Sequence, residues 1–328
     1  MSSGTYIDNG TGLPALKQPY KDVTMNMNTF FIKGDHQCIK DACNQYLNAL
    51  TVGSRTYFPI SSIVMLTYAQ LSGYALTDEN KIMGTMLEQD LAFFIPTLVV
   101  DSHLGLSIAF FPFQLFIDNP PAIVAGREIF GFNKTIGSFN KTETNDGLDL
   151  KVGTLAVKKF SADATFQMED FVHIQPCESS NPGHSDWTCW EDVLGEITKQ
   201  IGSMVGLSKI EALLGEAGKE LADLMKLQGN LVFLKQFRSV TDGTKTCYQS
   251  VVEAPISLNK FEGAGISKLH DITFTELESN PIAKTLGIAP TQNSVFSIWG
   301  KVQVTIENGK EIESHKRSRC KLLQRLLG

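Results

Sequence analysis

The residue in this sequence best suited to do chemistry is Lys134, which closely follows two aromatic residues, Phe130 and Phe132. A lysine amine is a nucleophile only when it is neutral, and burial lowers its pKa from the usual value of about 10.4. Phe130, Phe132 and Ile136 can supply such apolar surroundings. A neutral amine attacks a ketone to form an imine, which acts as an electron sink once it is protonated. The competing interpretation is an exposed lysine in a polar turn.

The segment that ends at Lys134 also carries a family resemblance. From Asp118 to Lys134 it reads DNPPAIVAGREIFGFNK. This resembles the acetoacetate decarboxylase pattern, in which Asp-Asn and Gly-Arg-Glu precede a Gly-aromatic-Pro-Lys that ends in the Schiff-base lysine. Lys134 falls on that lysine. The resemblance covers roughly residues 27 to 305 and implies a mainly β (α+β) fold, a curved antiparallel β-barrel with peripheral helices, in the acetoacetate decarboxylase-like superfamily.

The resemblance extends to a second candidate catalytic residue. Leu87-Glu88, followed by Phe93 to Pro96, is similar to the glutamate-bearing strand of the family, so Glu88 falls on its active-site glutamate. A carboxylate beside the amine can relay protons during imine formation or protonate an enamine. Arg127 and Glu128 are adjacent charges, and we interpret them as a pair that shapes the turn before Lys134.

The sequence departs from the family pattern at several positions that would line the pocket. The lysine is followed by Thr135 in place of a second lysine, and Asn133 replaces the preceding proline. The arginine of the first family strand aligns with Met25, and a second glutamate aligns with Ser62. The expected substrate pocket therefore contains Phe130, Phe132, Ser62, Met25 and Arg127. It is less charged than in the family, which favours a larger, apolar carbonyl compound over a small keto acid.

Three functions follow from this reading. The first is a lyase that forms a Lys134 Schiff base and removes carbon dioxide from a β-keto acid, with a polyketide-derived substrate of secondary metabolism as a hypothesis. The second is an aldolase, dehydratase or cyclase that uses the same imine. The third is a barrel that binds an apolar ligand, or promotes its reaction by shape, without a covalent bond. None of these needs a cofactor.

Other motifs with known chemistry are weak or missing. His173, Cys177, His184 and Cys189 are possible zinc ligands, but their spacing matches no familiar pair of ligand pairs, so no metal site is expected. The sequence contains no glycine-rich phosphate loop, no His-Glu-x-x-His and no Gly-x-Ser-x-Gly.

Composition and charge restrict the class of protein. The formal net charge is −6, which argues against a nucleic-acid partner because phosphate binding needs a basic surface. No uninterrupted apolar stretch is long enough to cross a membrane, and no signal peptide is visible. Six cysteines in 328 residues do not form a disulfide scaffold. We therefore predict a cytoplasmic protein whose partner is a small-molecule carbonyl substrate.

The remaining pattern predicts the elements that must position these residues. Short β-rich runs at 29–33, 62–70, 92–100, 106–117 and 297–306 predict strands, and apolar residues at helical spacing predict a helix over 36–50. Asp242-Gly243 between two β-prone runs predicts a hairpin. Two amphipathic helices are expected at about 190–227.

These elements divide the chain into three parts. We expect an N-terminal arm over residues 1–20, a barrel domain over 21–308 with a helical insertion at about 185–228, and a basic C-terminal tail over 309–328. Family members are commonly oligomeric, so the resemblance also implies a homo-oligomer.

Overall fold

The computed structural model describes residues 5–6, 18–72, 85–144, 147–178, 186–187 and 229–312. Most of these residues are in strands. The strands are β1 (Tyr20–Lys33), β2 (Arg55–Pro59), β3 (Ile63–Ser72), β4 (Glu88–Asp101), β5 (Leu106–Ile117), β6 (Lys134–Thr144), β7 (Gly147–Ala156), β8 (Gln167–Pro176), β9 (Asp186–Trp187), β10 (Gly229–Arg238), β11 (Thr246–Ile266), β12 (His270–Phe274), β13 (Thr291–Asn293), β14 (Phe296–Ile306) and β15 (Lys310–Ile312). The helices are α1 (His36–Cys43), the π-helical turn η1 (Asn44–Asn48), α2 (Pro120–Ile129) and α6 (Ile282–Thr285).

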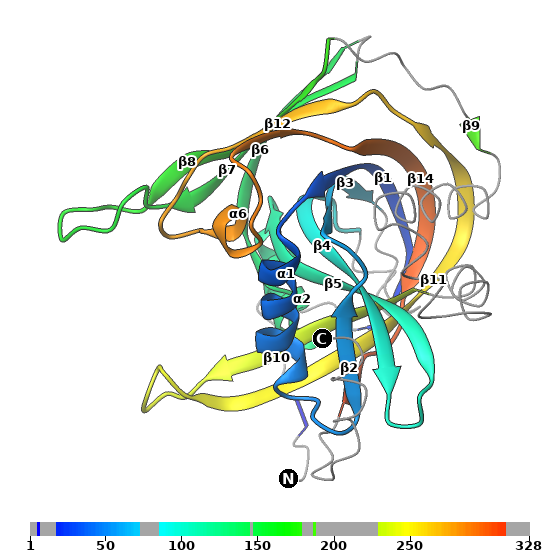
Figure 1. Ribbon diagram of the computed structural model, residues 1–328, viewed down its shortest axis with the longest axis vertical. Coiled ribbons are helices and arrows are strands. Elements are labelled where there is room, and N and C mark those ends of the chain that lie inside the picture. Colours follow the sequence, from blue (N-terminus) through cyan, green and yellow to red (C-terminus); the bar gives the residue numbers. More distant parts are fainter. Residues whose placement is uncertain are drawn as a thin grey trace.

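Seven strands form a hydrogen-bonded ring. In the order β5, β10, β11, β14, β1, β3 and β4 each strand pairs with the next, and β4 pairs back with β5. Figure 1 shows these strands curving around a common centre. The predicted mainly β fold with a curved sheet is therefore confirmed. The sheet is mixed, however, because β5 runs parallel to both β6 and β10, whereas the sequence predicted antiparallel pairing throughout.

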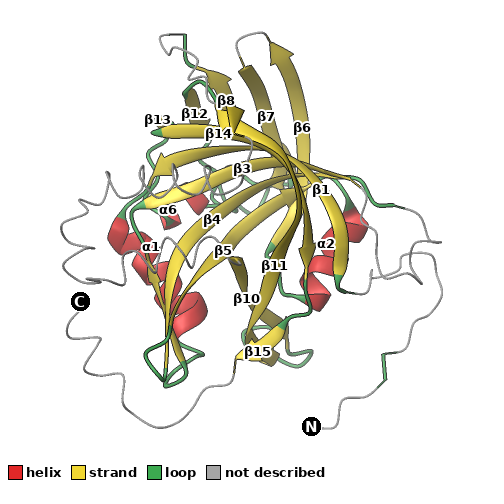
Figure 2. Ribbon diagram, turned by 90° about the vertical axis from the view of Figure 1, so that its right-hand side faces the viewer, coloured by secondary structure: helices red, strands yellow, loops and turns green. Residues whose placement is uncertain are grey.

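A branch of the sheet leaves the ring at β5. It runs through β6, β7, β8 and β12 to β13, and in Figure 2 β6, β7 and β8 rise above the ring. Lys134 is the first residue of β6, so it stands where the branch joins the ring. No helix in the described part of the chain is both long enough and apolar enough to span a bilayer.

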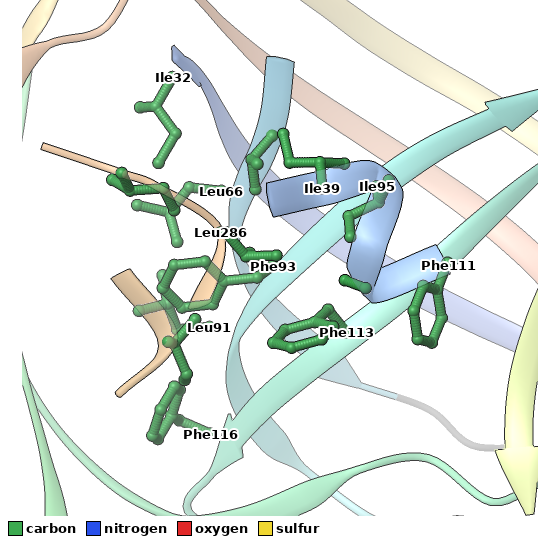
Figure 3. Close-up of a cluster of buried hydrophobic side chains, with 14 of the residues drawn as sticks. Ile32, Ile39, Leu66, Leu91, Phe93, Ile95, Phe111, Phe113, Phe116 and Leu286 are labelled. Carbon is green, nitrogen blue, oxygen red and sulfur yellow. The ribbon is translucent and has the colours of Figure 1, made fainter. Parts of the chain in front are cut away.

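The two faces of the ring strands carry different cores. On one face, aromatic and branched side chains pack against α1, which contributes Ile39 and Cys43. Figure 3 shows Phe93 and Phe116 among the side chains of this cluster. Large rings such as these bury much apolar surface and exclude water from this face.

The opposite face carries smaller and more flexible side chains. Ala69, Ala92 and Leu115 are buried there, and Met25 and Met27 pack against them. Side chains alternate between faces along a strand, so Ala92 and its neighbours two residues away share this face. Lys134 pairs with Leu115, and Leu115 with Ala92, which places the lysine on the same face.

Several predicted elements agree with the structure. The run at 106–117 coincides with β5, and the expected helix at 36–50 is α1 followed by η1. Asp35 caps α1 by accepting a hydrogen bond from the backbone N–H of Cys38. Asp242 lies in the turn between β10 and β11, as the hairpin signal predicted.

Strands β1, β15 and β9 lie at or near the predicted boundaries of the arm, the tail and the insertion. β1 begins at Tyr20, the last residue assigned to the N-terminal arm. β15 pairs with β11 and carries the sheet to Ile312, beyond the expected start of the tail. At the start of the predicted insertion, Asp186–Trp187 forms β9 on β11. The two amphipathic helices expected at 190–227 lie outside the described residues.

Candidate active site

A short helix and a tight turn position Lys134. Asn119 caps α2 by accepting from the N–H of Ala122, and proline at the first helical position suits this start. The helix ends where the N–H groups of Gly131 and Phe132 both donate to the carbonyl of Gly126. Gly131 has a φ of 92°, and a Cβ there would lie 2.5 Å from the Cα of Lys235. Only glycine fits this turn, which leads directly into β6.

Three contacts hold the lysine backbone and side chain in place. Arg127 Nη1 donates to the carbonyl oxygen of Lys134 at 3.1 Å. The Asn133 amide donates to the carbonyl of Phe113 at 3.1 Å. Gly126 lies against the lysine side chain, because a Cβ at that position would come within 2.9 Å of Lys134 Cδ and Cε. The missing side chain at Gly126 therefore leaves space for the lysine side chain.

The amine of Lys134 is buried beside a carboxylate. Lys134 is 7% exposed and Glu88 is 4% exposed. The Nζ atom lies 3.7 Å from Glu88 Oε1 and donates to the carbonyl of Ala122 at 3.4 Å. It also lies 5.0 Å from the ring centre of Phe132, within range of a cation–π interaction. The structure therefore brings the two predicted catalytic residues together.

A second carboxyl group, which sequence reasoning missed, belongs to the same site. Asp90 lies two residues after Glu88 on β4, on the same face, and is buried. Burial, and then the charge of Glu88, raise the pKa of Asp90 well above its usual range, while the charge of Lys134 opposes the shift. Asp90 therefore favours its protonated form beside the Lys134–Glu88 pair.

Tyr20 closes the cluster from β1, and sequence reasoning missed it as well. Its side chain is buried, and its ring meets Phe130 edge to face at 5.5 Å. Burial and the charge of Glu88 raise the pKa of the Tyr20 hydroxyl. The hydroxyl therefore stays protonated. Sequence reasoning assigned Tyr20 to the arm, so no signal connected it with Glu88.

The predicted pocket residues are only partly gathered around the amine. Phe130 and Phe132 pack together with ring centres 6.0 Å apart, next to Lys134. Met25 pairs with Leu71, which pairs with Glu88, so Met25 lies on the site face.

The structure treats the other two pocket predictions, Ser62 and Arg127, differently. Ser62 precedes β3, where Thr67 pairs with Ala92 in the row of residues that includes Leu115 and Lys134. Five residues (67 − 62) separate Ser62 from Thr67, a strand length of about 17 Å. The structure does not bring Ser62 to the amine. Arg127 lies on α2 and donates to the Lys134 carbonyl across the turn that precedes β6, and its expected pairing with Glu128 stays a prediction.

A cavity of about 490 Å³ adjoins this site through the ring of Phe132. Lys134 is not among its lining residues; Phe132 belongs to both the cavity wall and the surroundings of the amine. Arg127 also lines the cavity, together with the polar side chains of Glu128, Asn133 and Gln236. The aromatic part of the wall consists of Phe132 and of Tyr46, Phe111, Phe113, Phe233 and Phe237. The cavity therefore offers apolar surface beside the lysine.

The possible zinc ligands give no metal site in the part of the chain that the structure describes, where no group of three or more ligating side chains occurs. His173 lies 3.0 Å from an oxygen of Asp149, and Cys177 is buried. His184 and Cys189 lie outside the described residues.

Known structures share this architecture. No protein-family model matches the sequence, and a search of curated proteins finds no match either. An acetoacetate decarboxylase structure aligns with a TM-score of 0.57 and 12% identity, over 95% of this chain and 97% of that one. The acetoacetate decarboxylase of Legionella pneumophila aligns with a TM-score of 0.57 and 11% identity, over 97% and 94% of the two chains.

A third structure is the enduracididine biosynthesis enzyme MppR, complexed with the condensation product of pyruvate and imidazole 4-carboxaldehyde. It aligns with a TM-score of 0.53 and 11% identity, over 95% of this chain and 99% of that one. At these identities the likeness concerns the fold, and it confirms the resemblance found in the sequence at that level. This chain has the acetoacetate decarboxylase-like fold.

Proposed function

We propose that this protein is an enzyme that forms a Schiff base between Lys134 and a small carbonyl compound. The observation that carries the proposal is the buried amine of Lys134, 3.7 Å from Glu88 Oε1, with Gly126 leaving room for the side chain. A buried amine beside one carboxylate has a partner that can accept its proton before the amine attacks.

The reaction supported first is the loss of carbon dioxide from a β-keto acid. The Lys134 amine attacks the ketone carbon, and the carbinolamine loses water to give an iminium ion. The bond to the carboxylate then breaks, carbon dioxide leaves, and the electron pair moves into the iminium to give an enamine. Protonation of the enamine carbon and hydrolysis release the ketone and free Lys134.

A second candidate keeps the iminium but makes or breaks other bonds, as an aldolase, dehydratase or cyclase does. The surroundings of the amine favour it. Glu88, Asp90 and Tyr20 supply groups that can accept or donate protons, whereas Met25 stands where a cation would hold a substrate carboxylate. A neutral carbonyl compound suits such a site better than an anion.

The cavity beside Phe132 supports a substrate larger than acetoacetate. Its volume of about 490 Å³ falls in the range of small-molecule sites, and its wall meets the lysine through Phe132. We therefore propose an apolar, partly aromatic substrate whose carbonyl reaches Lys134 while the rest occupies this cavity. The cytoplasmic location and the homo-oligomer stay predictions, the second of which size-exclusion chromatography with light scattering tests.

Borohydride trapping tests the proposed function directly. The protein is incubated with a panel of β-keto acids and larger ketones, reduced, and analysed by intact mass and peptide mapping. We expect a substrate-dependent adduct on Lys134 that is missing in Lys134→Met and retained in Lys151→Met, a matched control at an exposed position. Carbon dioxide release then separates the two candidate reactions. Folded protein that binds a carbonyl ligand without any adduct would support non-covalent binding instead.

A further inference from the structure

The strand register places Asp90 in a row of side chains that runs past the amine. Lys134 pairs with Leu115 and Leu115 with Ala92, so these three lie side by side across three strands. Asp90 and Glu88 follow at two-residue intervals on the same face of β4, about 7 Å apart along the strand. On β4, Asp90 therefore lies between Ala92, which is in the same row as Lys134, and Glu88, whose carboxylate is 3.7 Å from the lysine Nζ.

The two carboxyl groups differ in their relation to the amine. Glu88 forms the ion pair with Lys134, and both are almost fully buried. Asp90 is buried as well, and the charges of Glu88 and Lys134 both act on it. When two buried carboxyl groups lie near a single cation, the favoured state has one carboxyl ionised and the other protonated. Such a pair offers a base and an acid on the same side of a bound carbonyl compound.

We propose that Asp90 is the catalytic acid that protonates the α-carbon of the enamine formed on Lys134. This inference rests on the proposed imine chemistry and assigns it a residue beyond Glu88. Glu88 takes the proton that the Lys134 ammonium loses before attack. Asp90 acts at a later step, in which the α-carbon of the enamine takes up a proton.

The π electrons of the enamine form a new C–H bond with the Asp90 proton, and the nitrogen lone pair forms the C=N bond of the iminium ion. Asp90 is left as a carboxylate beside the new positive charge. Water then hydrolyses the iminium, and Asp90 regains a proton from solvent, which is the proton that decarboxylation to a ketone consumes. An aldol or dehydration sequence uses the same step.

Hydrogen–deuterium exchange isolates this step without knowledge of the natural substrate. Butan-2-one and 4-phenylbutan-2-one serve as probes in D₂O, and NMR follows the exchange of their α-hydrogens. Exchange requires the Lys134 iminium, whose α-proton passes to the ionised form of Asp90. The protonated Asp90 carboxyl then exchanges its proton for a deuteron from D₂O, and the reverse transfer delivers that deuteron to the α-carbon. Borohydride trapping with the same ketones measures iminium formation separately.

We expect the wild-type protein to form the adduct and to catalyse exchange, and Lys134→Met to do neither. Asp90→Asn should form the adduct to the wild-type extent but exchange at least about 100-fold more slowly, the usual contribution of a general acid or base. Glu88→Gln should instead slow adduct formation. Asp163→Asn, which changes an exposed aspartate, should match wild type in both assays.

Several outcomes would overturn the assignment while leaving the proposed function intact. These are wild-type exchange in Asp90→Asn, loss of the adduct in folded Asp90→Asn, and a wild-type protein that forms the adduct but exchanges no probe. A wild-type protein that forms no adduct with any carbonyl compound would instead contradict the proposed function itself. If Asp90→Asn does not fold, Asp90→Ser and Asp90→Glu make the same comparison, and only the glutamate variant should retain exchange.

Discussion

The backbone of Gly126 lies so close to Lys134 that a single added carbon would meet the side chain of the lysine. A Cβ on Gly126 would lie 2.9 Å from both Cδ and Cε of Lys134 and 3.2 Å from Nζ. The glycine is in the middle of α2, where it weakens the helix by up to about 1 kcal/mol relative to alanine. The helix therefore gives up some intrinsic stability at the position where the lysine needs room.

Gly126→Ala should consequently separate stability from activity. We expect it to fold with a melting temperature near that of wild type, since helix propensity offsets part of the crowding. The rate of adduct formation at Lys134 should fall about tenfold or more, because the amine is displaced from Glu88. Pentane-2,4-dione is a suitable probe, since its adduct with an amine is a conjugated enaminone that absorbs in the ultraviolet.

Gly243→Ala is the matched control, because a Cβ at that turn residue would meet no atom within 4 Å. It should react with the dione at the wild-type rate. Equal rates for Gly126→Ala and wild type would show that the close approach of helix and lysine does not govern the reaction.

A second prediction concerns Asn133, which stands where the family pattern has proline. Its side-chain amide donates to the carbonyl of Phe113 at 3.1 Å and to Gln114 Oε1 at 2.6 Å, so it ties the start of β6 to β5. Asn133→Ala removes both bonds and should lower the free energy of unfolding by about 1–2 kcal/mol. It should also slow adduct formation at Lys134, because the residue before the lysine is no longer held by these hydrogen bonds. Urea denaturation and the dione assay measure the two effects.

Asn140→Ala, at an exposed position further along β6, provides the comparison. It should change the free energy of unfolding by no more than about 0.5 kcal/mol. An Asn133→Ala protein as stable and as reactive as Asn140→Ala would mean that the two amide hydrogen bonds do not hold the site.

How far the sequence predicted this site can be judged from individual residues. Lys134 and Glu88 were identified because the residue types around them resemble a known pattern, and the structure brings them together. Asp90 was missed because its place near Lys134 depends on the pairing of β4 with β5 and of β5 with β6, which local spacing does not reveal. Ser62 was misplaced because a loose alignment on β3 does not fix the register, and an error of several residues moves a side chain along the whole strand.

The strands and helices were likewise predicted only in part. β5 was predicted with its observed bounds because Gly105 precedes it and Asp118 ends it. Helix α2 was not predicted, although Asn119 followed by two prolines is a start signal that could have revealed it. β1 was predicted only from Thr29, because its first half alternates polar residues with methionines that lack a strong strand preference. Contacts within the ring stabilise that half, and no local pattern encodes them.

The raised pKa of Asp90 leads to a third prediction, on stability. Because the folded-state pKa lies above the unfolded value, the folded protein holds this proton more tightly, and stability declines as pH rises from about 4 toward the folded pKa. Asp90→Asn keeps a neutral side chain of the same shape and removes this decline. The variant should therefore be more stable than wild type at pH 7.5, and the difference should shrink toward pH 4. Thermal denaturation of both proteins across this range measures it.

Together with the expected loss of exchange, this would make Asp90 a residue that serves activity at the expense of stability. The exposed variant Asp163→Asn should show no such pH-dependent gain. An Asp90→Asn protein less stable than wild type at pH 7.5 would indicate that the native carboxyl is favourably ionised, contrary to the electrostatics described here.

His270 provides the last prediction, which concerns a buried histidine far along the chain from Lys134. The side chain is 2% exposed, its Nδ1 lies 2.8 Å from the carbonyl of Lys268, and its ring meets Phe30 edge to face. Burial lowers the pKa of His270 to about 4, although the Lys268 carbonyl and the charge of Asp271 oppose the shift. The folded state therefore holds the neutral ring.

Stability from this residue is fully present above the unfolded pKa of about 6.5 and is lost as pH falls toward 4, because the unfolded chain takes up the proton first. Wild type should lose about 2 kcal/mol of unfolding free energy through His270 between pH 7.5 and 5.0. His270→Asn, which keeps a donor near Nδ1 but cannot titrate, should lack that component, whereas His103→Asn, at an exposed turn, should retain it. Urea denaturation at the two pH values gives the result, and equal pH dependence in wild type and His270→Asn would show that the buried ring is not the group that titrates.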